Sequence, residues 1–320
     1  MLDAALCTPR SADAVATRVQ EIVGILRNDP RCSGAVGLLR DVPTHKADGM
    51  RQARRRCPAS VAGTLGWPRE LYEWDAERDA SYHKHSTDSV LGSALVLGNV
   101  SFPAQHFWDA IIFDLFFNGA PARPRRFFEA GARDGYAESN TLFYEKHLGW
   151  SGTLVEPTPM AKCNTKRNRP RSTVVHGAFC APGDSLKILP HARDKHPRSN
   201  ASFFIGPHQI PGYCNLGPGD WTAPCYNWRD LASAHNLSRV DFYSLDIDHE
   251  IEQQKLLKTW LEWEHFDPAA VFVECQHRQG CETLLQEFGY HTLLLENSQK
   301  RTYYGDVLAW KDTCRAWRTR

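Results

Sequence analysis

The chain has 320 residues, of which 42% are hydrophobic and 23% are charged, and its formal net charge is +1 at pH 7. This length fits one large domain, or one domain with a substantial extension, and is sufficient for a buried core. The 22 glycines and 19 prolines form no repeat, which excludes the fibrous and disordered classes. Because phosphate binding depends on a basic excess, the near-zero charge also argues against nucleic-acid binding.

The first hundred residues differ in character from the rest of the chain. Apolar residues from Val15 to Leu26 recur on one helical face, and Asn28-Asp29-Pro30 ends that predicted helix. Polar and turn-forming segments follow, and we interpret the basic run Arg54-Arg55-Arg56 among them as a solvated loop. We therefore treat residues 1–100 as an N-terminal extension of unknown role and residues 101–320 as the main domain.

The main domain alternates between helical and strand patterns. Short apolar runs predict strands at 126–130, 152–156, 172–176, 240–246, 270–274, 292–295 and 306–310. Helical periodicity predicts helices at 105–117, 140–148, 250–264 and 280–288. This alternation indicates an α/β fold with a doubly wound, mostly parallel sheet. Ligands of such folds bind beyond the carboxyl ends of the strands.

Ten cysteines occur at irregular spacings, and none forms a Cys-x-x-Cys pair. A structural zinc site is therefore disfavoured, because zinc fingers and ribbons need closely paired ligands. We interpret Cys275, with His277 and Cys281 nearby, as the end of a strand. The spacings leave the presence of disulfides open.

The sequence leaves two compartments open. Its first residues lack the features of a signal peptide and no apolar run is long enough to span a bilayer, so the cytoplasm is the default expectation and no membrane span is expected. Three glycosylation sequons, at Asn99, Asn200 and Asn236, together with the ten cysteines, favour the lumen of the secretory pathway as the alternative.

The turn after the first predicted strand of the main domain has the features of a ligand site. Glu129 ends the strand, and Gly131 and Gly135 follow. Arg133 occupies the middle glycine position of the dinucleotide fingerprint, which disfavours a nicotinamide cofactor. The acidic Glu129 suits a ligand with a cationic amino-acid end. Glu156, which ends the next strand 25 residues after Gly131, has the spacing of a carboxylate that binds a ribose.

Together these two features indicate S-adenosylmethionine as the cofactor. The alternative for Glu156 is that it caps a neighbouring helix or faces solvent.

Residues 135–157, which read GYAESNTLFYEKHLGWSGTLVEP, resemble the core of the FkbM-family methyltransferases. In that family the glycine turn leads to a Ser-Asn-Thr helix start, a Glu-Lys-x-Leu-Gly-Trp helix end and a Glu-Pro strand end. The resemblance continues at 243–246, 272–274, 289–290 and 306–308, and it covers about residues 100 to 312. It implies a class I, Rossmann-like methyltransferase that uses S-adenosyl-L-methionine.

The resemblance also implies positions for the parts of the cofactor. The predicted cofactor-binding residues are Glu129, Gly131, Ala132, Asp134 and Gly135 around the methionine part, Ser139 and Asn140 near its carboxylate, Glu156 at the ribose, Ala178 along the adenine and Asp246 near the sulfonium. For Ala178 and the adjacent Phe179, core packing is an equal alternative.

The predicted catalytic residues lie near the ends of two later strands. A hydroxyl acceptor needs a general base or a metal ion, and Asp246, Asp248, His249 and Glu274 are the candidates, with His277 behind them. Carboxylates and a histidine there could also hold a divalent cation such as Mg²⁺. The chain departs from the family because His249 replaces a glycine, which puts the acceptor side in doubt. A surface or capping role is the alternative for His249.

The function that the resemblance implies is O-methylation of a sugar or another polyhydroxylated acceptor, such as a glycan. A catalytically silent methyltransferase-like domain that serves binding or trafficking is the alternative. The sequence leaves the acceptor, the methylated atom and the oligomeric state undecided.

Charge is unevenly distributed along the main domain. Residues 161–200 contain nine Lys or Arg and two Asp or Glu, whereas residues 241–300 contain four and twelve. We expect the basic segment, including Lys162, Lys166, Arg167 and Arg169, to form a mobile rim that contacts an anionic acceptor or partner, and a solvated face without such a role is the alternative.

Overall fold

The computed structural model describes residues 11–28, 32, 55–72, 95–97, 100–104, 107–120, 123–136, 138–179, 185–188, 221–247, 250–275, 278–295 and 305–311. In these ranges, no helix has the length and apolar character needed to cross a membrane.

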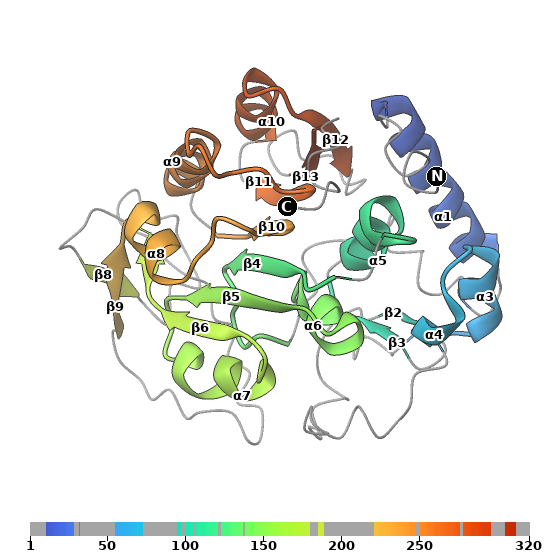
Figure 1. The fold of residues 1–320 in the computed structure, drawn as a ribbon, viewed down its shortest axis with the longest axis horizontal. Coiled ribbons are helices and arrows are strands. Elements are labelled where there is room, and N and C mark those ends of the chain that lie inside the picture. The colour runs from blue at the N-terminus through green and yellow to red at the C-terminus, as the bar shows by residue number, and fades with distance from the viewer. Residues whose placement is uncertain are drawn as a thin grey trace, which may run out of the picture.

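A seven-stranded sheet in the order β12-β13-β11-β10-β4-β5-β6 forms the centre of the molecule (Figure 1). Its strands are β4 (Arg126–Ala130), β5 (Ser151–Glu156), β6 (Thr173–His176), β10 (Phe242–Leu245), β11 (Ala270–Cys275), β12 (His291–Leu295) and β13 (Gly305–Trp310). Within this sheet β13 pairs antiparallel with both of its neighbours, and the remaining pairs are parallel. The predicted α/β fold with a mostly parallel sheet is confirmed.

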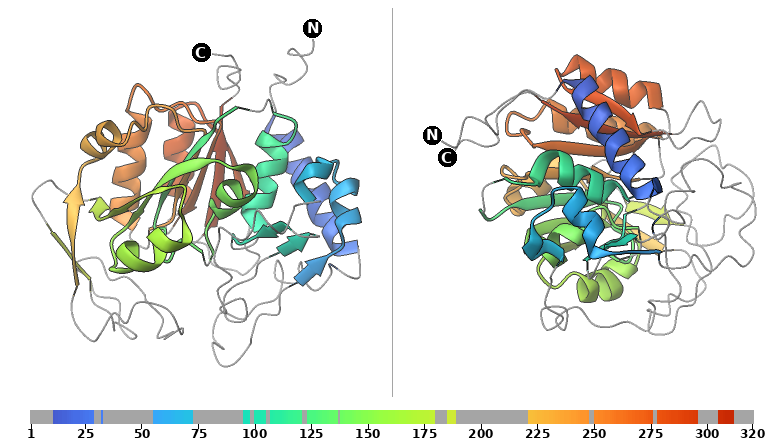
Figure 2. Two further views of the ribbon diagram at one scale, coloured as in Figure 1. Left: turned by 60° about the horizontal axis from the view of Figure 1, so that its bottom comes forward. Right: turned by 90° about the vertical axis from the view of Figure 1, so that its right-hand side faces the viewer.

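Helices cover both faces of the sheet. Successive residues of a strand point to opposite faces, so an apolar strand presents side chains for packing on each of them. Phe127 belongs to a core with α1 (Ala12–Asn28), α5 (Trp108–Ile112), the π-helix η5 (Phe113–Phe117) and α6 (Leu142–Leu148). The next residue, Phe128, belongs to a second core with α8 (Trp228–Ala234), α9 (Glu250–Leu261) and α10 (Arg278–Glu287). Figure 2 shows these layers from two further sides.

The described part of the N-terminal extension packs on the first of these faces. It contains α1, α3 (Ala59–Thr64), α4 (Arg69–Tyr72), β1 (Arg55–Cys57) and β2 (Leu95–Leu97). These two strands form a small sheet with β3 (Val100–Phe102), which crosses the predicted boundary at residue 100. Interpreting Arg54-Arg55-Arg56 as a loop was therefore wrong for Arg55 and Arg56, which pair with β2, and Arg54 lies outside the described residues. Pairing with a strand about 40 residues away leaves no local sequence signal.

One buried carboxylate links the extension to the main domain. Asp114 of η5 accepts hydrogen bonds from Arg18 Nε at 2.8 Å and Arg18 Nη2 at 2.9 Å, and from Trp67 Nε1 at 2.7 Å. Arg18 and Trp67 both belong to the extension, and α1 also contacts β12. The extension is thus an integral layer of the fold.

The remaining described elements follow β5 or β6 in the chain. The π-helix η6 (Ala161–Thr165) runs into α7 (Lys166–Asn168), and a small sheet has the order β7 (Ala178–Phe179), β9 (Trp221–Tyr226), β8 (Ser185–Ile188).

Disulfides, which the sequence left open, are present. Cys32 bonds to Cys57 and Cys275 bonds to Cys281, with Cα–Cα distances of 4.9 and 6.3 Å. Cys163 and Cys225 are disulfide-bonded as well.

The carboxyl ends of β4 and β10 approach each other so closely that only glycine fits between them. Gly131 has φ +88°, and a Cβ atom added to it would lie 1.7 Å from the backbone oxygen of Asp246. The backbone N–H of Asp246 in turn donates to Ala130 O at 3.0 Å.

We expect Gly131→Ala to destabilise the fold by about 3 kcal/mol, because the left-handed backbone is strained for alanine and β10 must also shift. Gly119→Ala is the matched control, since Gly119 has φ +75° with no atom within 4 Å of an added Cβ. It should lose only about 1 kcal/mol. Chemical denaturation of both variants measures the difference, and equal losses would contradict the close contact.

Candidate functional site

The turn between β4 and α6 is built around the buried carboxylate of Glu129. Its oxygens accept hydrogen bonds from Ser139 Oγ at 3.0 Å, Asn140 N at 3.0 Å, Thr141 Oγ1 at 2.6 Å and Arg169 Nη1 at 3.2 Å. The structure thus brings together Glu129, Ser139 and Asn140, as expected. These donors all come from the protein itself, so Glu129 fixes the path of the turn.

Arg169 is completely buried beneath this turn. Its Nη1 contacts Glu129, its Nε lies 2.8 Å from Glu145 Oε2, and its guanidinium lies 5.1 Å from the Phe127 ring centroid. Arg169 therefore belongs neither to the predicted mobile rim nor to a solvated face, because two buried carboxylates hold its charge inside the protein. Lys162, whose place in the rim was also predicted, is exposed.

Ser139 and Asn140 organise the start of α6. Ser139 Oγ accepts hydrogen bonds from the backbone N–H groups of Thr141 at 3.3 Å and Leu142 at 3.1 Å. Asn140 Nδ2 donates to Ser244 Oγ on β10 at 3.1 Å. These contacts hold the helix start against the sheet edge, and binding of a cofactor carboxylate by either side chain stays a prediction.

The other residues of the turn that were predicted to bind the cofactor pack against the protein interior. Ala132 and Asp134 are buried, and Asp134 Oδ1 accepts from Tyr136 N at 2.9 Å. A Cβ atom on Gly135, which has φ +75°, would lie 2.8 Å from the Arg169 side chain. The turn therefore packs directly against the Arg169 side chain.

Glu156 is buried at the carboxyl end of β5, beside the turn, so the alternative that it faces solvent is wrong. One oxygen, Oε2, accepts from Arg133 N at 2.6 Å, and the other accepts from Thr158 N at 2.7 Å. Burial raises the pKa of Glu156 to about 7, and the hydrogen bonds from Thr158 and Arg133 oppose that shift. Glu156 therefore changes charge near neutral pH at the position predicted for a ribose.

The segment predicted to lie along the adenine packs tightly against β9. Ala178 is buried, and a Cβ atom on Gly177 would lie 2.2 Å from the Tyr226 ring. Phe179 has its ring centroid 6.2 Å from those of both Phe128 and Trp228. These contacts support the core-packing alternative for Phe179.

Three residues with carboxyl groups lie at or near strand ends farther along the same edge. Asp246 follows β10, Glu274 lies on β11, and Asp306 on β13 is paired in register with Glu274. Burial raises the pKa of Asp306 to about 7, the hydrogen bond that Trp108 Nε1 donates at 2.5 Å opposes the shift, and the charge of Asp246 adds to it. Asp246 and Asp306 therefore interact electrostatically.

Asp306 is a candidate residue that the sequence analysis did not single out. Its signal was a carboxylate within an apolar strand, but its partner Trp108 lies 198 residues away in the chain. No local pattern connects two residues at that separation.

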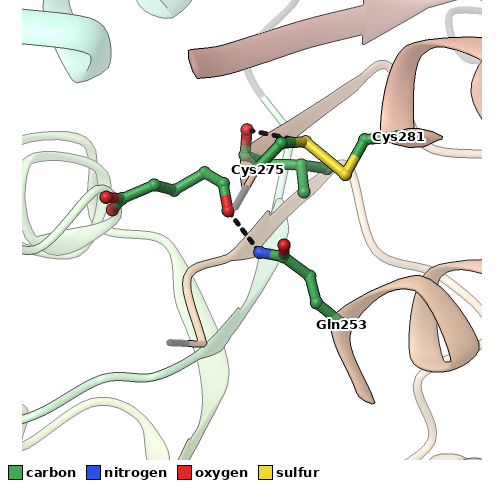
Figure 3. Close-up of a disulfide and its surroundings, with 5 residues drawn as sticks. Gln253, Cys275 and Cys281 are labelled. Carbon is green, nitrogen blue, oxygen red and sulfur yellow. Dashed lines mark hydrogen bonds between the residues drawn. A yellow bond between two sulfur atoms is a disulfide. The ribbon is translucent and has the colours of Figure 1, made fainter. Parts of the chain in front are cut away.

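A disulfide fixes the end of β11 next to Glu274. Cys275 is the last residue of β11 and Cys281 lies in α10, as the strand-end interpretation requires for Cys275 (Figure 3). Gln253 of α9 donates from its side chain to the backbone oxygen of Glu274. Both contacts hold the backbone at Glu274 in place.

The other predicted catalytic residues, Asp248 and His249, lie outside the described residues, as does His277. The part of the chain that the structure describes contains no group of three or more His, Cys, Asp or Glu side chains able to hold a metal ion.

No protein-family model matches the chain, and no curated protein matches it. Solved structures with a similar arrangement include a precorrin-6y C5,15-methyltransferase from Geobacter metallireducens, with 9% identity, TM-score 0.33, and coverage of 66% of this chain and 92% of that one. A human methyltransferase 10 domain containing protein has 10% identity and TM-score 0.33, and the match covers 95% of this chain and 98% of that one. The mitomycin 7-O-methyltransferase MmcR has 11% identity and TM-score 0.31, covering 95% and 73%. At these values the similarities assign neither function nor substrate.

Proposed function

We propose that this chain is an S-adenosylmethionine-dependent methyltransferase. The observation that carries the proposal is the buried Glu156 carboxyl, which lies at the carboxyl end of β5 and is hydrogen-bonded to the glycine turn that follows β4. A carboxylate at this position can accept both hydroxyls of a ribose. Arg133 in the turn disfavours the pyrophosphate of a nicotinamide cofactor, whereas a nucleoside joined to an amino acid has no phosphate to place.

The finer proposal is membership of the FkbM family. Support comes from the block 135–157, because α6 and β5 lie where the helix and strand of that motif are expected.

The proposed acceptor is a hydroxyl of a sugar or another polyhydroxylated molecule, including a glycan. S-adenosylmethionine, when bound, would supply the methyl group to the acceptor oxygen, and the electron pair of the broken carbon–sulfur bond would remain on sulfur. The hydroxyl proton must pass to a base. Asp306, whose pKa is raised to about 7 by burial and by the charge of Asp246, is the best-supported base among the described carboxyls, and Asp246 and Glu274 remain candidates.

A catalytically silent methyltransferase-like domain that serves binding or trafficking is the second candidate function. The tight packing of Phe179 and of Gly177 against Tyr226, where an adenine is expected, favours it. Absence of S-adenosylhomocysteine binding by the wild type would favour this candidate over the enzyme.

The proposed compartment is the secretory lumen. Disulfides persist in oxidising compartments, and six described cysteines are disulfide-bonded. Asn236, in the third sequon, is exposed, which suits glycosylation.

Glu156→Gln tests the cofactor site. We expect wild-type protein to bind S-adenosylhomocysteine and the variant to bind it at least about tenfold more weakly, because hydrogen bonds to a charged acceptor contribute about 1.5–3 kcal/mol. Isothermal titration calorimetry measures the affinities, with Glu262→Gln on the surface as control. Absence of binding by the wild type would overturn the proposed function.

The same affinity should depend on pH. Ribose hydroxyls that donate to Glu156 stabilise its ionised form, so binding releases a proton wherever the carboxyl starts protonated. Affinity for S-adenosylhomocysteine should therefore rise from pH 6 to pH 8 and level off above the pKa of about 7. Glu156→Gln should remove this dependence, and an unchanged profile in the variant would assign the titration to another group.

Asp306→Asn tests the base. We expect turnover to fall by about 10²-fold or more, since general bases contribute about 10²–10⁴ to rates, while affinity for S-adenosylhomocysteine stays the same. Transfer of labelled methyl to a glycan panel, followed by mass spectrometry, measures turnover. Asp267→Asn on the surface is the control. Full activity in Asp306→Asn would exclude Asp306, and cofactor binding without methyl transfer in the wild type would favour the silent domain.

A further inference from the structure

Arg133 and Glu138 form an ion pair across the glycine turn. Arg133 Nη1 lies 2.9 Å from Glu138 Oε2, and the side chains are 42% and 39% exposed. Both residues have left-handed backbone, with φ 50° for Arg133 and 59° for Glu138. Such backbone is strained for residues other than glycine and is concentrated at ligand sites.

The backbone of Arg133 is anchored while its side chain is exposed. Its N–H donates to Glu156 Oε2 at 2.6 Å, and its carbonyl accepts from Thr165 Oγ1 at 2.5 Å. Glu138 is held by a backbone bridge to Ala104. Water screens an exposed ion pair, so it contributes little to stability and either partner can be exchanged for a ligand group.

The buried charges of the turn are already committed to one another. Glu129 accepts from Ser139, Asn140, Thr141 and Arg169, so an ammonium group would have to displace protein donors. From residue 129 to residue 141 the sequence contains no Lys or Arg other than Arg133. An amino-acid ligand at this turn therefore finds one exposed cation, Arg133, and next to it one exposed carboxylate, Glu138.

We propose that Arg133 and Glu138 together determine specificity for the amino-acid end of the cofactor. Arg133 leaves Glu138 and binds the α-carboxylate, and Glu138 receives the α-ammonium. The ion pair matches the two opposite charges of an α-amino acid, and the hydrogen bond from Arg133 N to Glu156 places it beside the ribose position. This inference rests on the proposed function and transfers to Glu138 the ammonium contact that the sequence suggested for Glu129.

Three ligands distinguish the contribution of Arg133 to binding from that of Glu138. S-adenosylhomocysteine carries both charges, its decarboxylated form carries only the ammonium, and 5′-methylthioadenosine carries neither. Calorimetry with wild type, Arg133→Gln and Glu138→Gln gives nine affinities. Glutamine matches glutamate in length, is shorter than arginine and removes the charge of either residue. Both side chains are exposed, so the fold should stay intact, and thermal unfolding verifies this.

Arg133→Gln should weaken binding of S-adenosylhomocysteine by at least about tenfold. It should leave the decarboxylated ligand and 5′-methylthioadenosine within about twofold of wild type. Glu138→Gln should weaken the decarboxylated ligand and leave 5′-methylthioadenosine unchanged. Arg133→Lys should restore part of the affinity for S-adenosylhomocysteine.

Equal effects of Arg133→Gln on all three ligands, or no effect on any of them, would contradict the roles proposed for Arg133 and Glu138. Neither result would contradict the proposed function. If the wild type binds none of the three ligands, the roles proposed for Arg133 and Glu138 and the proposed function are both contradicted. Arg133→Gly relieves the left-handed strain, so weak binding of S-adenosylhomocysteine by a more stable Arg133→Gly variant would attribute the loss to the guanidinium.

Discussion

The buried guanidinium of Arg169 is the interaction on which the candidate site depends. It contacts Glu129 at the end of β4 and Glu145 in α6, and the glycine turn rests on its side chain. Two carboxylates and one arginine are stable in the interior only when donors satisfy all their charges, and removing one partner of such a pair generally costs about 3–5 kcal/mol. The network therefore holds strand, turn and helix in one arrangement.

Glu156 and Asp306 are two buried carboxyls with a pKa of about 7 at the same edge of the sheet. Burial is the main cause in both, but their neighbours differ. Glu156 accepts backbone N–H groups next to the turn, which suits recognition of a neutral diol. Asp306 accepts an indole N–H and lies near Asp246, which suits accepting a proton. Under the proposed function, these different hydrogen-bond partners assign recognition of the ribose to Glu156 and proton transfer to Asp306.

The layer that covers one face of the sheet also contributes to the site. Asp114 joins η5 to Arg18 and Trp67 of the extension, and Trp108, from the preceding helix, donates to Asp306. The position of α5 therefore depends on the extension on one side and affects a candidate base on the other. Residues outside the motif block thus support the proposed chemistry.

The sequence by itself determined the α/β order, the seven strands of the main sheet and the place of Glu156, because apolar periodicity and turn residues are local signals. Only the tertiary structure decided that Arg169 is buried, that Glu129 is saturated by internal donors and that Arg55 and Arg56 join a strand. It also brought Trp108 to Asp306. These contacts join residues from 10 to almost 200 positions apart, and charge alone does not reveal whether a side chain finds its partner in water or inside the fold.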